Sequence, residues 1–284
     1  GNVDEVTERP EPGAAAELPR DRDGLVELWR ALAQAEGTMD ITSARFILSQ
    51  LIALDAGHVD YFWDVMADPN EPDRVRLFAM VTIERQVDEA DVPRLTELTD
   101  PSQDATTRSF ATHMLGQIFA EPARERLRAL MDDSEMRVAV AATVGLVQQR
   151  QEAGLAFLPE LYYREDLGPV QREQLALAIQ PEHAARFQDL FIDIVSDPSL
   201  RPPSRHKSVS MLVAAGTPEA IAALERAAEN DPSPTMQQLA QRALDERRTA
   251  ETAEGQAAPS AGDGATAAAK DSDAAATGTT AETN

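Results

Sequence analysis

Cysteine is absent from this chain of 284 residues, and lysine occurs only as Lys207 and Lys270. The lack of cysteine excludes disulfide bonds, thiolate catalysis and cysteine-ligated zinc. Aromatic residues make up only 5% of the chain, whereas apolar residues make up 43%. Alanine, leucine and valine must therefore fill the core, and such a composition favours closely packed helices over a sandwich of sheets.

Membrane spans and catalytic motifs are absent as well. No run of about 18 apolar residues is present that could cross a bilayer, and the sequence has neither a glycine-rich phosphate loop nor a Gly-x-Ser-x-Gly turn. The four histidines do not have the spacing of metal ligands; they are His58, His113, His183 and His206. We therefore predict no catalytic residue, no metal site and no cofactor.

Acidic residues outnumber basic ones strongly, which gives a formal net charge of -23. Residues 24–250 alone carry 36 acidic and 22 basic side chains, or -14, so the excess is not confined to the ends of the chain. Such a charge repels nucleic acids and anionic lipid. We expect no nucleic-acid partner, and solubility alone is a sufficient use for the charge.

A recurring junction organises the sequence between Asp68 and Asp133. Asp68-Pro69-Asn70 precedes one apolar-periodic run, and Asp100-Pro101-Ser102 precedes the next, 32 residues later. Repeats of this length are typical of stacked helix pairs. The junctions are Asp68, Asp100, Asp132, Asp166, Asp197 and Asp231, separated by 32, 32, 34, 31 and 34 residues. Aspartate caps free N–H groups and proline fits the first turn of a helix, so we expect each junction to begin a helix.

The apolar pattern divides the chain into three parts. Residues 1–21 are predicted to be a disordered acidic tether, and residues 249–284 a disordered acidic tail rich in alanine, threonine and glycine. Residues 22–248 form the repeat region. Within it we expect a capping helix that ends near residue 36, helix pairs over residues 40–67, 68–99, 100–131, 132–164, 165–196 and 197–230, and a closing helix over residues 233–248.

The sequence begins with Gly1 and continues into the proline-rich tether. This start resembles the mature end of a bacterial lipoprotein, in which a lipidated cysteine would stand directly before Gly1. A processed protein of the cell envelope or periplasm, held by a lipid anchor, is one hypothesis for its location. An ordinary disordered N-terminus on a cytoplasmic protein is the alternative.

The repeated motif Asp-Pro-x5-Val-Arg-x2-Ala resembles that of HEAT and HEAT-like repeats, including the phycobilin-lyase type. It stands here as Asp68-Pro69, Val75-Arg76 and Ala79, and again as Asp100-Pro101, Thr107-Arg108 and Ala111, followed by Leu115-Gly116. The resemblance covers about residues 40–248. It implies an all-α fold, a right-handed α-solenoid of about six helix pairs with helical caps, and it says little about function. It also implies a structural ladder formed by Asp68, Asp100 and Asp132 with Arg76, Arg108 and Arg137.

Two kinds of surface feature depart from the repeat pattern and are candidates for binding a partner. Three consecutive aromatic residues on one short helix cannot all face one core, so they form either a bulky cap against Trp29 or an exposed hot spot. A second helix carries two arginines on one face, and in the resembled family second helices line the concave side. The partner-binding candidates are Tyr61, Phe62, Trp63, Arg124, Arg128, Tyr162 and Tyr163.

These features favour a non-enzymatic scaffold that binds another protein or peptide along its concave surface. The alternative is enzymatic, because some HEAT-like proteins are chromophore lyases and others are DNA glycosylases. A glycosylase needs a basic groove, which the charge of -14 over residues 24–250 opposes. A lyase, or an accessory protein acting on a chromophore-bearing protein, remains open, and a tetrapyrrole titration without a visible-band shift would dismiss it.

Overall fold

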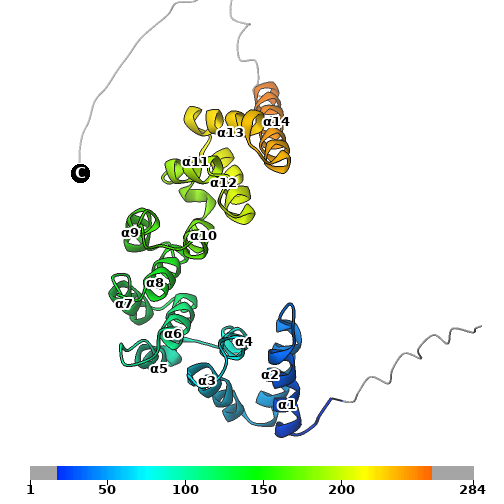
Figure 1. Ribbon diagram of the computed structural model, residues 1–284, viewed down its shortest axis with the longest axis vertical. Helices are drawn as coiled ribbons and strands as arrows, with labels where there is room; N and C mark the ends of the chain where they lie inside the picture. The colour runs from blue at the N-terminus through cyan, green and yellow to red at the C-terminus, as the bar shows by residue number, and fades with distance from the viewer. Residues whose placement is uncertain (1–17, 258–284) are drawn as a thin grey trace, which may run out of the picture.

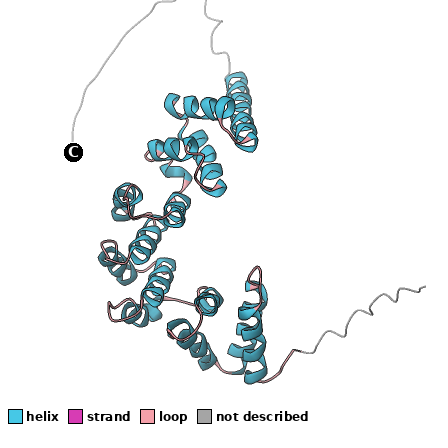
Figure 2. Ribbon diagram, in the orientation of Figure 1, coloured by secondary structure: helices cyan, strands magenta, loops and turns pink. Residues whose placement is uncertain are grey.

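The computed structural model describes residues 18–257, and this part of the chain contains only helices and loops (Figure 2). The α-helices of the first half are α1 (Arg22–Gln34), α2 (Ile41–Leu54), α3 (Asp60–Ala67), α4 (Asp73–Ile83), α5 (Val92–Leu98), α6 (Ala105–Gln117) and α7 (Glu121–Leu130). Those of the second half are α8 (Met136–Gln148), α9 (Glu152–Tyr162), α10 (Pro169–Ala178), α11 (Gln188–Ser196), α12 (Pro202–Ala215), α13 (Pro218–Asn230) and α14 (Pro234–Ala257). Single 3-10 turns precede three of them, η1 (Ala56–Val59), η2 (Glu89–Asp91) and η3 (Pro181–His183).

The helices stack into an open arc, which confirms the predicted all-α solenoid (Figure 1). Six helix pairs, from α2–α3 to α12–α13, lie between the first helix α1 and the last helix α14. From α4 onward the first helix of each pair lies on the inner, concave side, and the second lies on the outer side (Figure 1). We call α4, α6, α8, α10 and α12 the inner helices, and α3, α5, α7, α9, α11 and α13 the outer helices.

The aspartates of the recurring junction form turns and do not begin the helices. Asp68 and Asp100 each accept a hydrogen bond from the N–H two residues ahead, at 2.9 Å in both cases. The carbonyl of each also closes a β-turn with the residue three ahead. Proline in second position suits such a turn because its φ is already fixed near the required value. The inner helices begin several residues later; α6, for example, is capped by Asp104.

Apolar stripes at helical spacing fill the space between the two layers. The predicted stripe of α2 is buried throughout, and its members are Ala44, Ile47, Leu48 and Leu51. Trp29 is fully buried and ties α1 to the array, since its indole N–H donates to the Thr82 hydroxyl at 3.1 Å. Two apolar cores run along the arc, one from α1 to α8 and the other from α8 to α14. Helix α8 contributes to both and therefore joins the two halves.

Helices α6 and α8 touch backbone to backbone at Gly116 and Gly145. A Cβ atom placed on Gly145 would lie 2.8 Å from the Cα of Gly116, and one on Gly116 would lie 3.0 Å from the Cα of Gly145. Real side chains do not approach backbone atoms so closely. Glycine is required here because two inner helices cross without room for any side chain between them.

The C-terminal boundary differs from the prediction, because α14 continues to Ala257, beyond the expected end at residue 248. Alanine, glutamate and glutamine in residues 249–257 are strong helix formers that extend a helix already anchored by packing. The tether and tail predicted for residues 1–17 and 258–284 lie outside the described residues. No helix among the described residues is long and apolar enough to cross a membrane.

The Gly116–Gly145 contact predicts that Gly145→Ala destabilises the protein although alanine favours helices. The gain in helix propensity is about 1 kcal/mol, whereas forcing two packed helices apart costs about 2–3 kcal/mol. We expect the free energy of unfolding to fall by about 1–2 kcal/mol in urea denaturation. Gly57→Ala is the matched control, because its Cβ meets only the movable Asp55 carboxylate, at 3.2 Å. A Gly145→Ala protein as stable as the wild type would contradict the required close approach.

Candidate functional site

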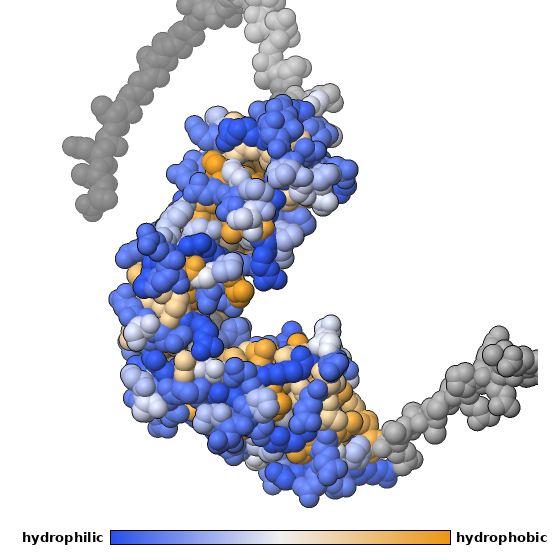
Figure 3. All heavy atoms as spheres, in the orientation of Figure 1, coloured by the Kyte–Doolittle hydropathy of each residue, from blue (hydrophilic) through white to orange (hydrophobic). Residues whose placement is uncertain are grey.

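The concave side of the arc carries a groove of about 680 Å³ that crosses four successive inner helices. Figure 3 shows the arc hollowed between its two ends, with hydrophobic residues at the wall of the hollow. Valine and leucine at the α10 end stand open to solvent, with Val170 51% and Leu177 41% exposed. The apolar lining residues are Met39, Leu77, Met80, Phe110, Val140, Ala141, Val144, Val170, Leu177 and Ala178.

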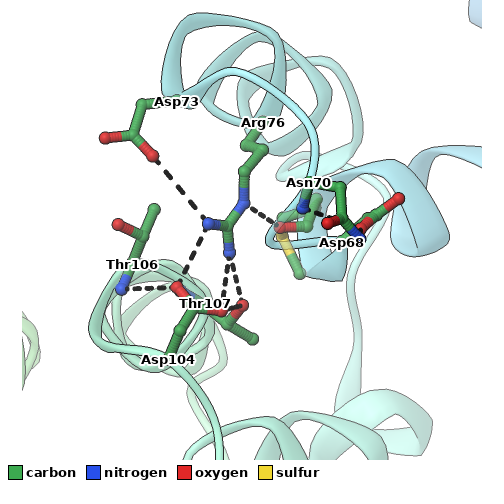
Figure 4. Close-up of polar contacts among 8 residues, drawn as sticks. Asp68, Asn70, Asp73, Arg76, Asp104, Thr106 and Thr107 are labelled. Carbon is green, nitrogen blue, oxygen red and sulfur yellow. Dashed lines mark hydrogen bonds and ion pairs between the residues drawn. The ribbon is translucent and has the colours of Figure 1, made fainter.

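Arginines at the fourth position of the inner helices hold the layers in register. Arg76 in α4 is buried, and its Nε donates to the Met66 carbonyl at the end of α3 at 3.0 Å (Figure 4). The same side chain reaches across to α6, where it binds both oxygens of the Asp104 carboxylate at 3.1 and 3.0 Å. One guanidinium therefore satisfies an open carbonyl of an outer helix and docks the next inner helix.

Three further inner helices repeat this arrangement in whole or in part. Arg108 donates to the Thr99 carbonyl and pairs with Asp133, and Arg205 donates to the Val195 carbonyl and pairs with Asp231. Arg172 donates to the carbonyl of Tyr162, the last residue of α9, and to that of Arg164 just beyond it. In α8 the fourth residue is Ala139, so α8 has no arginine in the position that docks the following inner helix.

The opposite edge of the groove is held by side chains that reach the C-terminal end of the first helix in a neighbouring repeat. Gln149 donates to the carbonyls of Gly116 and Ile118 at 2.9 and 3.1 Å, and Gln180 donates to the Gln148 carbonyl at 3.0 Å. Arg45 donates to the Val81 carbonyl and pairs with Glu84 at 2.7 Å. Carbonyls at the ends of α4, α6 and α8 thus find partners in neighbouring repeats, which fixes the inner helices as one surface.

The ladder therefore differs from the one that the resemblance to HEAT-like repeats implied. Arg76 and Arg108 belong to it, but they pair with Asp104 and Asp133, whereas Asp68 and Asp100 form turns. Asp132 is exposed, and no ion pair involves it among the described residues. Arg137 is the second residue of α8 and points to solvent beside Glu135 at 3.3 Å. Spacing along the chain cannot reveal how far a turn shifts the start of each helix.

The three consecutive aromatic residues form an internal cluster at the N-terminal end of the arc. Phe62 and Trp63 are buried, and Phe62 packs edge-on against Trp29 with ring centroids 5.0 Å apart. Tyr61 is half-buried, and its hydroxyl accepts a hydrogen bond from Arg30 at 2.5 Å. The arrangement is that of a cap against Trp29. Phe62 and Trp63 leave no open aromatic surface for a partner to contact.

The remaining candidates lie on the outer helices and not on the concave side. Arg124 and Arg128 belong to α7, where both pair with Glu121, at 3.6 and 2.8 Å. Tyr163 follows α9 and is 53% exposed, and its hydroxyl donates to Asp193 at 2.6 Å. Burial, followed by this hydrogen bond, raises the pKa of Tyr163. The neighbouring Tyr162 is buried. The prediction that second helices line the concave side is wrong for this chain, because the first helices do (Figure 1).

A chain of polar contacts beside the groove joins three repeats. His113 on α6 lines the groove and faces Glu84 at 3.4 Å, and Glu84 in turn pairs with Arg45 on α2. The hydrogen bond from His113 lowers the pKa of Glu84. These residues are separated by as many as 68 positions in sequence, so sequence spacing gave no signal of the cluster. Among the described residues, no group of three or more acidic residues and histidines is arranged to hold a metal ion.

Comparisons with known proteins leave the function open. Neither the protein-family models nor the curated proteins compared with the chain give a match. Among solved structures, the chain is similar to human deoxyhypusine hydroxylase in complex with glycerol, with 16% sequence identity and a TM-score of 0.31. The overlap covers 80% of this chain and 96% of that one. A TM-score of 0.31 is too low for the likeness to bear on fold or activity.

The buried position of Arg76 predicts a large difference between two arginines that the sequence grouped together. Arg76→Ala leaves the Met66 carbonyl without its donor and the Asp104 carboxylate without its ion-pair partner, so we expect a loss of about 2–4 kcal/mol in unfolding free energy. Arg137→Ala removes only an exposed pair and should cost about 0–0.5 kcal/mol. Urea denaturation of the two variants measures the difference. Equal losses of unfolding free energy in the two variants would show that burial of an arginine does not determine how much it stabilises the protein.

The Arg76–Asp104 pair also predicts a pH dependence of stability. Burial raises the pKa of Asp104, but hydrogen bonds from Arg76 and Thr107 outweigh burial and lower this pKa to about 2. Because the folded pKa lies below the unfolded value of about 3.9, the stabilisation is complete above pH 4 and disappears as the pH falls through 2. Relative to wild type, Asp104→Asn should lose about 1–2 kcal/mol at pH 6, a figure reduced for partial exposure.

The difference between the wild type and Asp104→Asn should therefore shrink as the pH is lowered from 6 toward 2.5. Asparagine is a suitable residue because it keeps one oxygen to cap α6 while it removes the charge and the second acceptor oxygen. Thermal unfolding of both proteins across this range provides the measurement. A difference that stays constant with pH would indicate that the charge of Asp104 contributes nothing.

Proposed function

We propose that the protein is a non-enzymatic scaffold whose inner helices bind a segment of another protein. The observation that carries the proposal is the groove of about 680 Å³ with an open apolar wall on α4, α6, α8 and α10. Solvent-exposed apolar surface in a concave site is typical of binding surfaces, because a partner removes it from water. Helical-repeat proteins generally bind along such extended concave faces.

The chemical character of the lining supports recognition. Aliphatic side chains alternate with amides and hydroxyls, which offer hydrogen bonds without a fixed charge; the polar uncharged members are Thr106, Ser109, Gln148, Gln171 and Gln174. Burying one valine or leucine against a partner contributes about 1.5–3 kcal/mol. Several such contacts over four repeats are sufficient for specific binding after the entropic cost of association is met.

The bracing of both edges supports the same function. Side chains such as Arg76 and Gln149 join neighbouring repeats at opposite ends of the inner helices. A surface fixed before binding loses little conformational entropy when the partner arrives. The lining helices therefore suit a preformed site, in which affinity does not depend on ordering the scaffold.

Site-specific crosslinking in the cells of origin tests the proposal. A photoreactive amino acid at Ala141 lies in the groove, whereas the same residue at Ala156 lies on the outer helix α9 and is exposed. We expect a crosslinked protein from position 141 and none of the same mass from position 156. Crosslinks of equal yield at both positions, or no crosslink at 141, would contradict a concave binding site.

A matched pair of leucine substitutions measures how much the groove contributes. Leu177→Asp places a carboxylate on the apolar wall, and Leu54→Asp does so at an equally open site outside the groove, since Leu54 is 51% exposed. Each substitution is combined with the photoreactive residue at position 141, and the yield of the crosslinked partner is measured. This yield should fall about tenfold or more for Leu177→Asp, because burying an unpaired carboxylate costs more than 1.4 kcal/mol. The yield should not change for Leu54→Asp.

A further inference from the structure

The N-terminal end of the arc exposes apolar side chains that no neighbouring repeat covers. Figure 3 shows hydrophobic residues gathered at this end, where α1 and α2 lie. Phe46 and Leu54 on α2 are 48% and 51% exposed. The end repeats of a solenoid normally carry a polar outer face. The opposite end of the arc follows this rule, because the exposed side of α14 carries Gln238, Gln241 and Asp245, and the N-terminal end departs from it.

The exposed side of α2 has no charge, although 26% of the residues in the chain are charged. Arg45 is the one charged residue of this helix, and it is turned away toward the Val81 carbonyl and Glu84. At about 100° per residue, the exposed positions fall within about 140° of the helix circumference and form one continuous stripe. We call this set the α2 stripe, and its members are Thr42, Phe46, Ser49, Gln50, Ala53 and Leu54.

The α2 stripe consists of a ridge beside a row of small side chains. The ridge side chains recur every four residues, and the two smallest side chains of the stripe lie in the next row. The ridge is Thr42, Phe46, Gln50 and Leu54, and the small residues are Ser49 and Ala53. Two helices most often pack by laying such a ridge of each helix beside the same ridge of the other. The stripe therefore has a shape into which a second α2 fits.

The ridge is also symmetric about Gln50. Phe46 stands four residues before Gln50, and Leu54 stands four residues after it. When two α2 helices lie antiparallel about a two-fold axis beside Gln50, each Phe46 meets Leu54 of the partner subunit, so the same contact forms twice. The axis brings the two Gln50 side chains together, and an amide suits its own copy because it both donates and accepts hydrogen bonds. A second copy of the chain requires this symmetry, whereas a different protein does not.

Charge favours this face as the place where two copies meet. Each copy has a net charge of -23, so most other contacts between copies are repulsive. Residues 20–23, which border the stripe at the start of α1, contain two arginines and two aspartates and add no net charge. Asp40 and Asp55 lie at the ends of α2, where each caps a backbone N–H. Across the axis each lies about 15 Å or more from its own copy, beyond the Debye length of about 8 Å.

The chain's own N-terminal segment continues from the edge of the stripe but is poorly suited to cover it. Leu18 lines a hollow of about 440 Å³ together with Gln50 and Leu54. Residues 1–17 precede it and contain five carboxylates, two valines and no leucine, isoleucine, methionine or aromatic residue. Such a segment offers little apolar surface to Phe46 and Leu54, whereas a second copy offers the same two side chains in return.

We infer that two copies of the chain associate through α2, in an antiparallel contact about a two-fold axis beside Gln50. The α2 stripe lies outside the concave groove, so the inference is independent of the proposed function. The face of α2 is about 21 Å long and about 10 Å wide, and Leu18 and Pro19 extend it. This area is smaller than the roughly 800 Å² per partner of a stable interface. The dimer is therefore weak, with a dissociation constant on the order of 100 µM.

Sedimentation equilibrium of the full chain tests the association. Between about 20 and about 500 µM protein, the average mass should rise from the monomer value of 30.8 kDa toward twice that value. The dissociation constant should fall about threefold or more between about 50 and about 500 mM salt, because screening weakens the repulsion between the copies. A monomer at every concentration overturns the inference. Growth beyond a dimer also overturns it, since a two-fold contact closes on itself.

A substitution at Phe46 locates the contact. Phe46→Glu places a carboxylate against Leu54 of the partner subunit at both ends of the contact, so the dissociation constant should rise about tenfold or more. Glutamate is a good helix former and the site is exposed, so α2 tolerates the change. Phe119→Glu is the matched control, since Phe119 is 68% exposed but lies outside α2. Equal losses in the two variants would assign the association to exposed aromatic residues in general and overturn the inference.

Single cysteines determine the position of the axis, because the chain contains no other thiol. Gln50→Cys should form a disulfide-linked dimer under mild oxidation, since the axis places position 50 beside its own copy. Thr42→Cys is the control. Its two copies lie about 24 Å apart along the antiparallel helices, too far for a disulfide. Equal yields from the two positions, or none from position 50, overturn the two-fold arrangement.

The same variant distinguishes the other occupants of the stripe. If Gln50→Cys stays monomeric and its thiol is protected from a maleimide reagent, residues 1–17 cover the stripe. If it stays monomeric and its thiol reacts as fast as that of Gln238→Cys, on the exposed side of α14, the stripe is open to another protein. Both results overturn the inference, and neither bears on the concave groove.

Discussion

The contact between an inner-helix arginine and the end of an outer helix is the interaction on which the arc depends. Outer helices end with carbonyls that have no partner within the helix, and Arg76, Arg108, Arg172 and Arg205 supply donors to them. Three of these arginines then bind a carboxylate of the following repeat. Buried charge is tolerated because carbonyls and carboxylates surround it, and the same contacts set the position of each successive repeat.

This arrangement also determines the character of the concave surface. The carboxylates that neutralise the arginines lie on the connections between helices, at Asp104, Asp133 and Asp231. The inner helices can therefore present valine, leucine and amide side chains in the groove, with Asp73 as the one carboxylate in its lining. At α8, Ala139 interrupts the series toward α10, and the Gly116–Gly145 contact adds close packing between α6 and α8 to the Arg108–Asp133 pair.

Particular residues show how far sequence reasoning reached. The stripe from Ala44 to Leu51 follows helical spacing and is buried as predicted, since a helix has one way to present residues at that spacing to a core. The resemblance to HEAT-like repeats assigns Asp68 and Arg137 to the ladder, yet one forms a turn and the other faces solvent. Each residue advances a helix by about 100°, so a helix that starts two residues later turns its side chains by about 200° around its axis. Sequence spacing does not reveal such a change.

The sequence by itself determined the class of fold and the division into helix pairs, because periodic apolar residues and regular junctions act locally. Only the tertiary structure decided which layer faces inward and which residues meet there. Leu77, Phe110, Val144 and Leu177 are spread over 101 positions and share one groove because four helices stack side by side. The outer helices carry twelve carboxylates, whereas the inner helices carry only Asp73 and Glu173. This uneven distribution follows from the same stacking, since a local pattern specifies one face of a helix but not the neighbour or the solvent that the face meets.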